Sequence, residues 1–309
     1  MGAIEDTLKE NRPNLSAGSV RTYASILKNL AKQMKVELEN PGDVVKNYKA
    51  ILDHLKETPA RLRKTRLASL IVFIGKHEGG EKALEAFRGL MMEDGKKSDE
   101  EAKEQKMTEK QKENWMDWEA ILERYEALKK EVAPLLKRED GLDKKQFARV
   151  QMFVLLSLMV LIPPRRSLDW TAFKIRDVDK EKDNYLGTEK RKPVLVFNNY
   201  KTAGKTGRQT VEVPKELHQI LKRWIVLNPH EWLLMNYGQT GGITPTQLVQ
   251  LLYGFFGKNI STSMLRKIFL THKYKDIPAL KEMEQTAEAM GHSIPEMMKS
   301  YVKRDAPSV

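Results

Sequence analysis

The first 90 residues carry hydrophobic side chains at the three- and four-residue spacing of amphipathic helices. Four helices are predicted, in "LSAGSVRTYASILKNLAKQM", after "NPGD", in "TPARLRKTRLASLIVFIGKH" and in "GEKALEAFRGLM". Ser16 is a suitable N-cap for the first of them, and a Thr-Pro pair suits the start of the third. The pattern therefore predicts an all-helical domain over residues 1–92.

Residues 93–112, "EDGKKSDEEAKEQKMTEKQK", are almost wholly polar and charged. This composition is typical of a linker or of an exposed helix between domains, so we predict a linker here and a second domain over 113–309. Thr108 and Gln111 form a capping-box pattern that opens the next helix. The tryptophans on its apolar stripe are interpreted as core residues rather than as a platform for stacking bases.

The second domain changes its hydrophobic period. "MFVLLSLMVLI", residues 152–162, is shorter than the roughly 20 residues that span a bilayer and predicts a buried core helix. "KPVLVFNNY" and "QTVEVP" alternate like strands around "KTAGKTGR", which predicts a β-hairpin with a basic tip. Helices then resume, and Gly291 suits the C′ position of the last long one. The expected fold is mainly α with a small β-hairpin or sheet (α+β), in two domains.

The charge balance of the chain indicates the kind of partner to expect. The 309 residues include 54 Lys and Arg against 42 Asp and Glu, a formal charge of +12, which favours a polyanion such as nucleic acid, although solubility alone also explains it. Basic residues of the third helix are candidates for phosphate contacts, or form a solvated face: Arg61, Arg63, Lys64 and Arg66. The chain has no cysteine, which excludes thiol chemistry and permits a reducing compartment. We expect an intracellular protein, in the nucleus or cytoplasm with its target DNA, and no membrane partner.

Most catalytic motifs are missing from the sequence. It has no P-loop, no GxGxxG after a strand, no HExxH, no nucleophile elbow and no compact set of carboxylates for Mg²⁺. We therefore expect no metal and no cofactor. Phosphoryl transfer without metal requires a side-chain nucleophile, fixed positive charge on the non-bridging oxygens and an acid for the leaving oxygen.

Four segments supply candidates for these roles: "RSLDWTAFKIRDVD", "NNYKTAGKTGR", "SMLR" and "MGHSIPEMMKSYVK". In this order they resemble the catalytic domain of tyrosine recombinases, the phage-integrase family. Two departures stand out. "PPR" replaces the commoner Thr-Gly-Leu, which leaves Arg165 as a second occupant of the first arginine position, and Ser263 stands where histidine is usual. The N-terminal helices resemble the family's core-binding domain more loosely, and the connector resembles that of recombinases from large DNA viruses and eukaryotic mobile elements.

The resemblance implies a role for each matched residue. Tyr301 would attack the scissile phosphate, Lys201 would act as general acid with Lys205 as the alternative, and His292 and Ser263 would contact the phosphate. Arg166 and Arg266 would hold its non-bridging oxygens, and Asp169 would orient Arg166. Lys205 and Arg208 would bind DNA beside the hairpin.

The implied activity is site-specific recombination of double-stranded DNA through a 3′-phosphotyrosyl intermediate, by a homodimer or homotetramer, without metal or ATP. The alternatives are a type IB topoisomerase-like enzyme, which usually has a β-rich N-terminal lobe, and an inactive DNA-binding protein of the same fold, which Ser263 favours.

Overall fold

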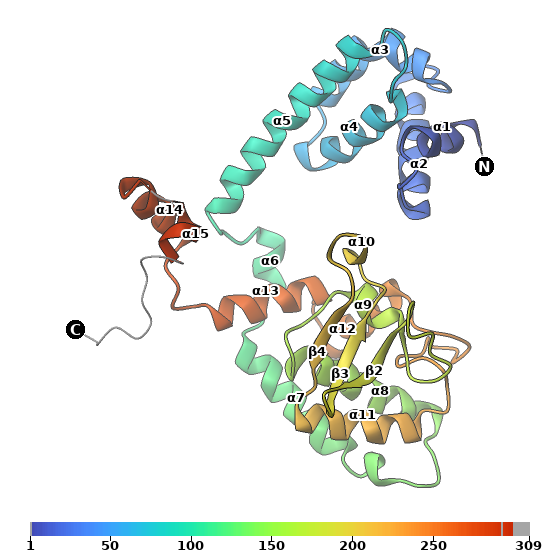
Figure 1. Cartoon of the computed structure of the whole chain (residues 1–309), viewed down its shortest axis with the longest axis vertical. Coiled ribbons are helices and arrows are strands. Elements are labelled where there is room, and N and C mark those ends of the chain that lie inside the picture. The colour runs from blue at the N-terminus through green and yellow to red at the C-terminus, as the bar shows by residue number, and fades with distance from the viewer. Residues whose placement is uncertain (1, 292, 299–309) are drawn as a thin grey trace. The chain divides into compact units, whose positions relative to one another are not determined.

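The computed structural model describes residues 2–291 and 293–298. It divides into two compact units (Figure 1). The helical unit comprises the described residues of Met1–Lys106 and Pro278–Val309, and the mixed unit comprises Met107–Ile277. None of the helices in the described ranges combines the length and apolar character that a membrane crossing requires.

The N-terminal part of the helical unit consists of five helices: α1 (Ala3–Asn11), α2 (Ala17–Met34), α3 (Pro41–Lys56), α4 (Ala60–Ile74) and α5 (Glu81–Lys103). Their starts follow local signals. The Ser16 side chain accepts from the Ser19 amide at α2, and Asn40 and Asp43 form a reciprocal capping box at α3. The four predicted helices are confirmed, and α1 is an additional helix whose Leu8 is fully buried.

A glycine allows α1 and α4 to pack at the end of α4. Gly75 has φ +55°, and a Cβ there would lie 2.3 Å from the Asn11 side chain. The Asn11 amide donates to the carbonyl oxygens of Val72 and Phe73 at 3.1 and 2.9 Å. These contacts satisfy carbonyl groups that the helix end leaves without an intrahelical partner.

The predicted linker is only partly extended chain. Residues 93–103 continue α5 as a mostly exposed helix, in which Asp94 is 6% exposed and paired with Arg63 of α4. After a break, the predicted capping box of Thr108 and Gln111 opens the short α6 (Glu109–Glu113). The predicted continuous helix is wrong here, since α6 ends and α7 (Trp118–Val132) begins separately.

The mixed unit contains most of the remaining elements. Its helices after α7 are η1 (Leu135–Lys137), α8 (Lys144–Val160), α9 (Ser167–Thr171), α10 (Ala203–Thr206), α11 (Lys215–Leu227), α12 (Pro245–Phe256) and α13 (Thr262–Lys273). Its strands are β1 (Phe173–Lys174), β2 (Asn184–Glu189), β3 (Lys192–Phe197) and β4 (Gln209–Glu212). They form one sheet in the order β1-β2-β3-β4, parallel between β1 and β2 and antiparallel elsewhere. The α+β prediction is confirmed at this level: helices predominate around a small mixed sheet.

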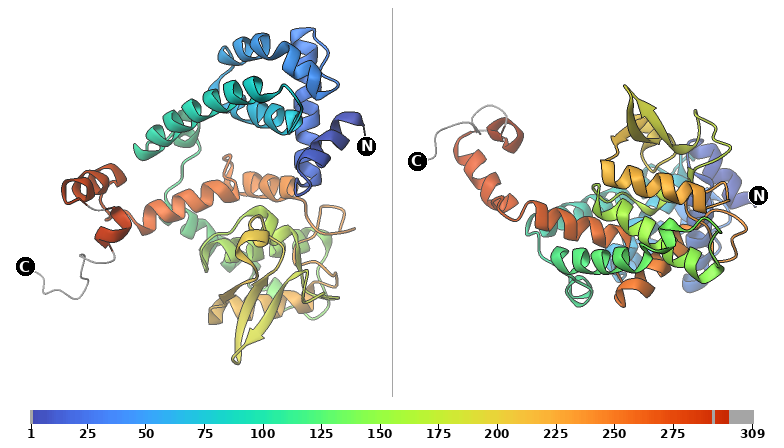
Figure 2. Two further views of the ribbon diagram at one scale, coloured as in Figure 1. Left: turned by 45° about the horizontal axis from the view of Figure 1, so that its top comes forward. Right: turned by 90° about the horizontal axis from the view of Figure 1, so that it is seen from below.

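The β3–β4 pair is the predicted hairpin, with Leu195 opposite Val211 and α10 at the end of its connection (Figure 1). Alternation along β3 gives the sheet two buried faces. Leu195 and Phe197 enter the main core, whereas Val194 and Val196 pack with Tyr185 in a small separate cluster. The strands stand at the edge of this unit in the right-hand view of Figure 2, with α8 and α11 to one side.

Helix α8 forms the centre of the core of the mixed unit, as the long apolar run predicts. Helix α7 packs against it, with Trp118 buried and Tyr125 stacked on Phe153 at 5.6 Å between ring centroids. The interpretation of Trp118 as a core residue is therefore confirmed.

Residues 278–298 group with the helical unit, unlike the predicted second domain over 113–309. They contain α14 (Leu280–Ala289) and α15 (Ile294–Glu296). The Glu284 carboxylate lies 2.8 Å from the Lys103 ammonium, and Lys281 lies 2.7 Å from Glu104. These contacts to the end of α5 explain the grouping. Gly291, with φ +73°, follows α14 as predicted.

Candidate active site

A cavity of about 260 Å³ lies in the mixed unit where α9, the β3–β4 connection and α13 meet. Three arginines line it, Arg165, Arg166 and Arg266, together with the Asp169 carboxylate. Its walls also include residues from the loop before α9 and from the β3–β4 hairpin: Pro163, Pro164, Tyr200, Thr202, Gln209 and Val211. The first and second predicted arginines, 100 residues apart in the chain, therefore share one cavity.

A hydroxyl pair connects the segments that carry Arg166 and Arg266. Arg166 is the N-cap residue of α9, and the next residue, Ser167, shares a 2.9 Å hydrogen bond with the Thr262 hydroxyl at the start of α13. Thr262 is 3% exposed. Arg266 lies four residues after Thr262 and therefore on the same face of α13. The hydroxyl pair thus connects the starts of two helices that carry arginine into the cavity.

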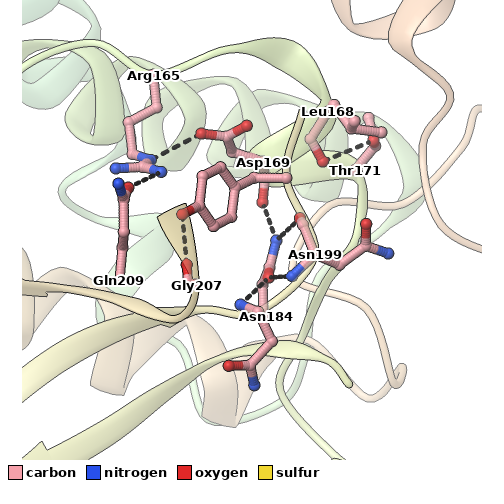
Figure 3. Close-up of polar contacts among 10 residues, drawn as sticks. Arg165, Leu168, Asp169, Thr171, Asn184, Asn199, Gly207 and Gln209 are labelled. Atoms are coloured by element: carbon pink, nitrogen blue, oxygen red, sulfur yellow. Dashed lines mark hydrogen bonds and ion pairs between the residues drawn. The ribbon is translucent and has the colours of Figure 1, made fainter. Parts of the chain in front are cut away.

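Arg165, the less favoured candidate in the sequence, is held by two hydrogen bonds, which Figure 3 shows, and by a ring contact. Its Nε donates to Asp169 Oδ2 at 2.7 Å, and its terminal nitrogen donates to Gln209 Oε1 at 3.1 Å. The guanidinium also lies 3.9 Å from the centroid of the Phe197 ring, a cation–π contact. The expectation that Asp169 orients Arg166 is therefore corrected, because the carboxylate is bound to Arg165 instead.

Asp169 is 2% exposed, and its other oxygen, Oδ1, has no hydrogen-bond partner in this structure. A buried carboxylate oxygen without a donor is unfavourable.

The lysine candidates lie on the connection between β3 and β4. Tyr200 and Thr202 line the cavity, and Lys201 between them is exposed. Lys205 is exposed on α10, and Arg208 forms an exposed ion pair with Glu189 at 3.1 Å. The structure thus brings the chain on both sides of Lys201 to the arginines, while Arg208 belongs to the outer edge of the hairpin.

Ser263 is separated from this cavity. Its side chain is exposed and lines a different depression of about 270 Å³ with Lys110 and Asn114. The predicted contact between Ser263 and a phosphate held by the arginines has no support in this arrangement. His292 and Tyr301 lie outside the described residues.

The basic residues of α4 divide into two kinds. Arg61 and Lys64 are exposed, and Arg66 is half-buried with one nitrogen 3.4 Å from the Thr58 hydroxyl. Arg63 instead makes an ion pair with Asp94, in which its side chain is 13% exposed. This guanidinium stabilises the helical unit and is not free to bind phosphate as predicted.

Other parts of the described chain do not offer a competing reaction centre. No group of three or more His, Asp or Glu side chains in the described ranges is arranged to hold a metal ion. A larger cavity, about 790 Å³, lies among α7, η1, α8 and α11. Three of its charged side chains already have partners, since Lys129 pairs with Glu216 at 2.6 Å and Arg223 donates to the Leu136 carbonyl.

Sequence reasoning missed the residues that support the arginines from a distance. Gln209 accepts a hydrogen bond from Arg165, 44 residues earlier in the chain. Asn184 donates to the carbonyl of Asp169, 15 residues earlier. No periodicity or spacing in the sequence marks either one. The adjacent arginines of "PPRR" were a signal for Arg165, but only the direction of its side chain distinguishes it from Arg166.

Comparison of the chain with protein-family models and with curated proteins finds no match.

Proposed function

We propose that this protein is a DNA strand-transfer enzyme of the tyrosine-recombinase type, which cuts and rejoins double-stranded DNA through Tyr301. The observation that supports the proposal best is the arginine cavity. Three guanidinium groups and one carboxylate line a space of about 260 Å³, which leaves positive charge in excess. Guanidinium stays charged at any physiological pH and offers paired donors that match phosphate oxygens.

The charge balance favours the transition state of phosphoryl transfer over the ground state. A phosphodiester carries one negative charge, and attack by a tyrosine oxygen places additional charge on its non-bridging oxygens. Fixed cations around those oxygens stabilise the transition state most, and they need no rearrangement during the reaction. Arg165 is already oriented by Asp169 and Gln209, so its side chain loses little conformational entropy when a phosphate binds.

In the proposed reaction the Tyr301 hydroxyl gives its proton to water, its oxygen forms a bond to phosphorus, and the bond from phosphorus to the 5′ oxygen breaks. Lys201 gives a proton to that 5′ oxygen, and a 5′-hydroxyl leaves. In the reverse step the 5′-hydroxyl of another strand gives its proton to Lys201 and bonds to phosphorus, the bond from phosphorus to the Tyr301 oxygen breaks, and that oxygen takes a proton from water. The phosphotyrosyl bond conserves the energy of the phosphodiester, so no nucleotide hydrolysis is required.

The helical unit is proposed to bind the duplex. Arg61 and Lys64 are exposed in the first turns of α4, and the overall charge of +12 favours binding to a polyanion through release of counterions. Binding that depends on such contacts weakens steeply as salt is raised. Assembly as a dimer or tetramer on DNA belongs to the same proposal.

An inactive DNA-binding protein is the second candidate. Ser263 replaces a histidine that the family uses at the phosphate, and its exposed side chain lines a depression apart from the arginines. One fewer donor at the reacting phosphate would slow the chemistry. This candidate predicts tight DNA binding that does not depend on Tyr301.

Covalent capture tests the proposal without knowledge of the target sequence. The protein is incubated with a pool of nicked duplexes that contain a randomised segment, denatured in SDS, and separated from unattached DNA. Retained DNA is sequenced, and the attachment site is mapped by mass spectrometry. Tyr301→Phe is the test variant. Tyr253→Phe is its matched control, because Tyr253 is 55% exposed on α12 and does not line the arginine cavity.

An adduct on Tyr301 that Tyr301→Phe abolishes and Tyr253→Phe retains supports the proposal. Relaxation of a supercoiled plasmid without exchange between two duplexes would indicate a topoisomerase instead. DNA binding with no adduct from either the wild-type protein or Tyr253→Phe would refute cleavage and favour the inactive protein.

A further inference from the structure

A fully buried asparagine connects α9, whose Asp169 binds Arg165, to the chain that leads into the loop carrying Lys201. Asn184, the first residue of β2, is 0% exposed. Its side-chain amide nitrogen donates to the carbonyl oxygens of Asp169 and Asn199 at 2.8 and 2.7 Å (Figure 3). Its side-chain oxygen accepts from the backbone amides of Asn198 and Asn199 at 2.8 and 2.7 Å. Both donors and both lone pairs of the side chain are therefore used.

The partners of Asn184 belong to two parts of the candidate site. Asp169 lies in α9 and binds Arg165 through its carboxylate. Asn198 and Asn199 follow β3 and lead directly into the lysine loop, which comprises residues 200–207. The Asn184 side chain thus joins the backbone of Asp169, which binds Arg165, to the backbone that leads into the lysine loop.

The far end of the lysine loop is closed by a second contact. The Tyr200 hydroxyl donates to the Gly207 carbonyl at 2.5 Å, and Tyr200 is 6% exposed. The Tyr200 ring centroid also lies 5.6 Å from the Arg165 guanidinium carbon. The two ends of the loop are therefore held together beside Arg165, while the loop's own Lys201 and Lys205 remain exposed.

We infer that Asn184 is a positioning residue, which sets the place of the Lys201 ammonium relative to the arginine-bound phosphate. The inference rests on the proposed function and adds a residue that the resemblance does not assign. A general acid must reach the leaving oxygen within hydrogen-bond distance, and a displacement of about 1 Å can cost about 100-fold in rate. A fully satisfied amide is suited to this task, because each lost bond leaves a buried backbone group without a partner.

Asn184→Asp preserves the size of the side chain and removes both N–H donors. The carboxylate would then face the carbonyl oxygens of Asp169 and Asn199, which repel it. We expect single-turnover cleavage of the duplex recovered by covalent capture to fall about 100-fold. Tyr200→Phe, which removes only the hydroxyl contact to Gly207, is expected to reduce cleavage in the same direction and by a smaller factor.

Asn228→Asp is the matched control. Asn228 is also 0% exposed in the mixed unit, and its side chain donates to the Trp232 carbonyl and accepts from the His230 amide. The hydrogen-bond partners of its side chain, His230 and Trp232, belong neither to α9 nor to the lysine loop. Thermal unfolding of all variants measures how much each substitution destabilises the mixed unit.

The deciding measurement replaces the 5′-bridging oxygen of the scissile phosphate with sulfur. With oxygen, the bond to phosphorus breaks and the leaving oxygen takes a proton from Lys201. With sulfur, a thiolate leaves without a proton, because its conjugate acid is far stronger than an alcohol. A defect in the position of the acid is therefore rescued by sulfur, whereas a general loss of folded protein is not.

The expected result is slow cleavage of the oxygen substrate by Asn184→Asp and Tyr200→Phe, with rates close to wild type on the sulfur substrate. Asn228→Asp should show no such difference between the two substrates. Equal loss on both substrates for Asn184→Asp, or an unchanged rate for Tyr200→Phe if Asn184→Asp does not fold, would overturn the inference. Failure of the wild-type protein to form any adduct would instead refute the proposed function.

Discussion

Arg63 offers a sharp test, because the sequence and the structure predict different roles for it. Its Nε and one terminal nitrogen donate to the two carboxylate oxygens of Asp94 at 2.7 and 2.6 Å. The other terminal nitrogen donates to the carbonyl oxygens of Leu55 and Lys56 at 3.2 and 2.9 Å. One side chain thus connects α4 to α5 and to the end of α3. We predict that Arg63→Ala lowers the free energy of unfolding of the helical unit, an effect that a residue used only to contact DNA would not have.

The expected magnitude follows from burial. The Arg63 and Asp94 side chains are 13% and 5% exposed, so removal of the guanidinium leaves a carboxylate with little water around it. Loss of a charged hydrogen-bonded partner at such a site costs about 2–4 kcal/mol. An exposed ion pair elsewhere on the chain would contribute under about 1 kcal/mol.

The pair also predicts a pH dependence. The hydrogen bonds from Arg63 hold the pKa of Asp94 below its ordinary value, despite burial, which acts in the opposite direction. The stabilisation of the folded protein by this pair is therefore fully present above the unfolded-state pKa of Asp94, about 3.9. It is lost as pH falls through the lower pKa of Asp94 in the folded protein. Wild type should lose this stability in acid, and Asp94→Asn should lack that part of the pH dependence.

The assay can separate the two units. All five tryptophans, at positions 115, 118, 170, 224 and 232, belong to the mixed unit, so their fluorescence reports only on that unit. Circular dichroism follows helices in both units, and hydrogen exchange resolves the amides of α4 and α5. Arg63→Ala should speed exchange in α4 and α5 and leave the tryptophan transition in place.

Lys64→Ala is the matched control, because Lys64 is the exposed neighbour of Arg63. If Lys64 contacts phosphate, its loss reduces the slope of log affinity against log salt by about 0.9 without loss of stability. The structural role of Arg63 would be refuted if Arg63→Ala left exchange in α4 and α5 unchanged and altered only the salt slope.

Three further outcomes are expected. Arg266→Ala should slow covalent adduct formation by about 10²–10³-fold at equal stability, whereas Lys267→Ala on the same helix should not, because only Arg266 lines the arginine cavity. Ser263→Ala should leave the single-turnover cleavage rate unchanged, since its exposed side chain lies apart from that cavity; a large fall would restore Ser263 to the reaction. Gly75→Ala should lower the free energy of unfolding by about 2 kcal/mol or more in urea denaturation, because a Cβ would lie 2.3 Å from a side-chain atom at φ +55°, whereas Gly89→Ala, with open space around it, should be neutral or stabilising.

The sequence by itself determined the local features of this protein. Ser16 caps α2, Thr108 and Gln111 cap α6, and Gly291 follows α14, because each signal acts on backbone groups within a few residues of itself. Hydrophobic period likewise distinguished the buried helix α8 from the β3–β4 hairpin. The polar composition of residues 93–103 left a linker and an exposed helix both open, and the structure continues α5 through them as a mostly exposed helix.

Only the tertiary structure decided which side chains act together. Asp94 pairs with Arg63 across 31 residues, and Ser167 meets Thr262 across 95. Asp169 binds Arg165, four residues before it, rather than Arg166, although both arginines line the same cavity. Such choices depend on distance and direction between separate elements, which no local pattern of residue types encodes. The types of residue in the candidate site are therefore visible in the sequence, while their pairing and support come from the fold.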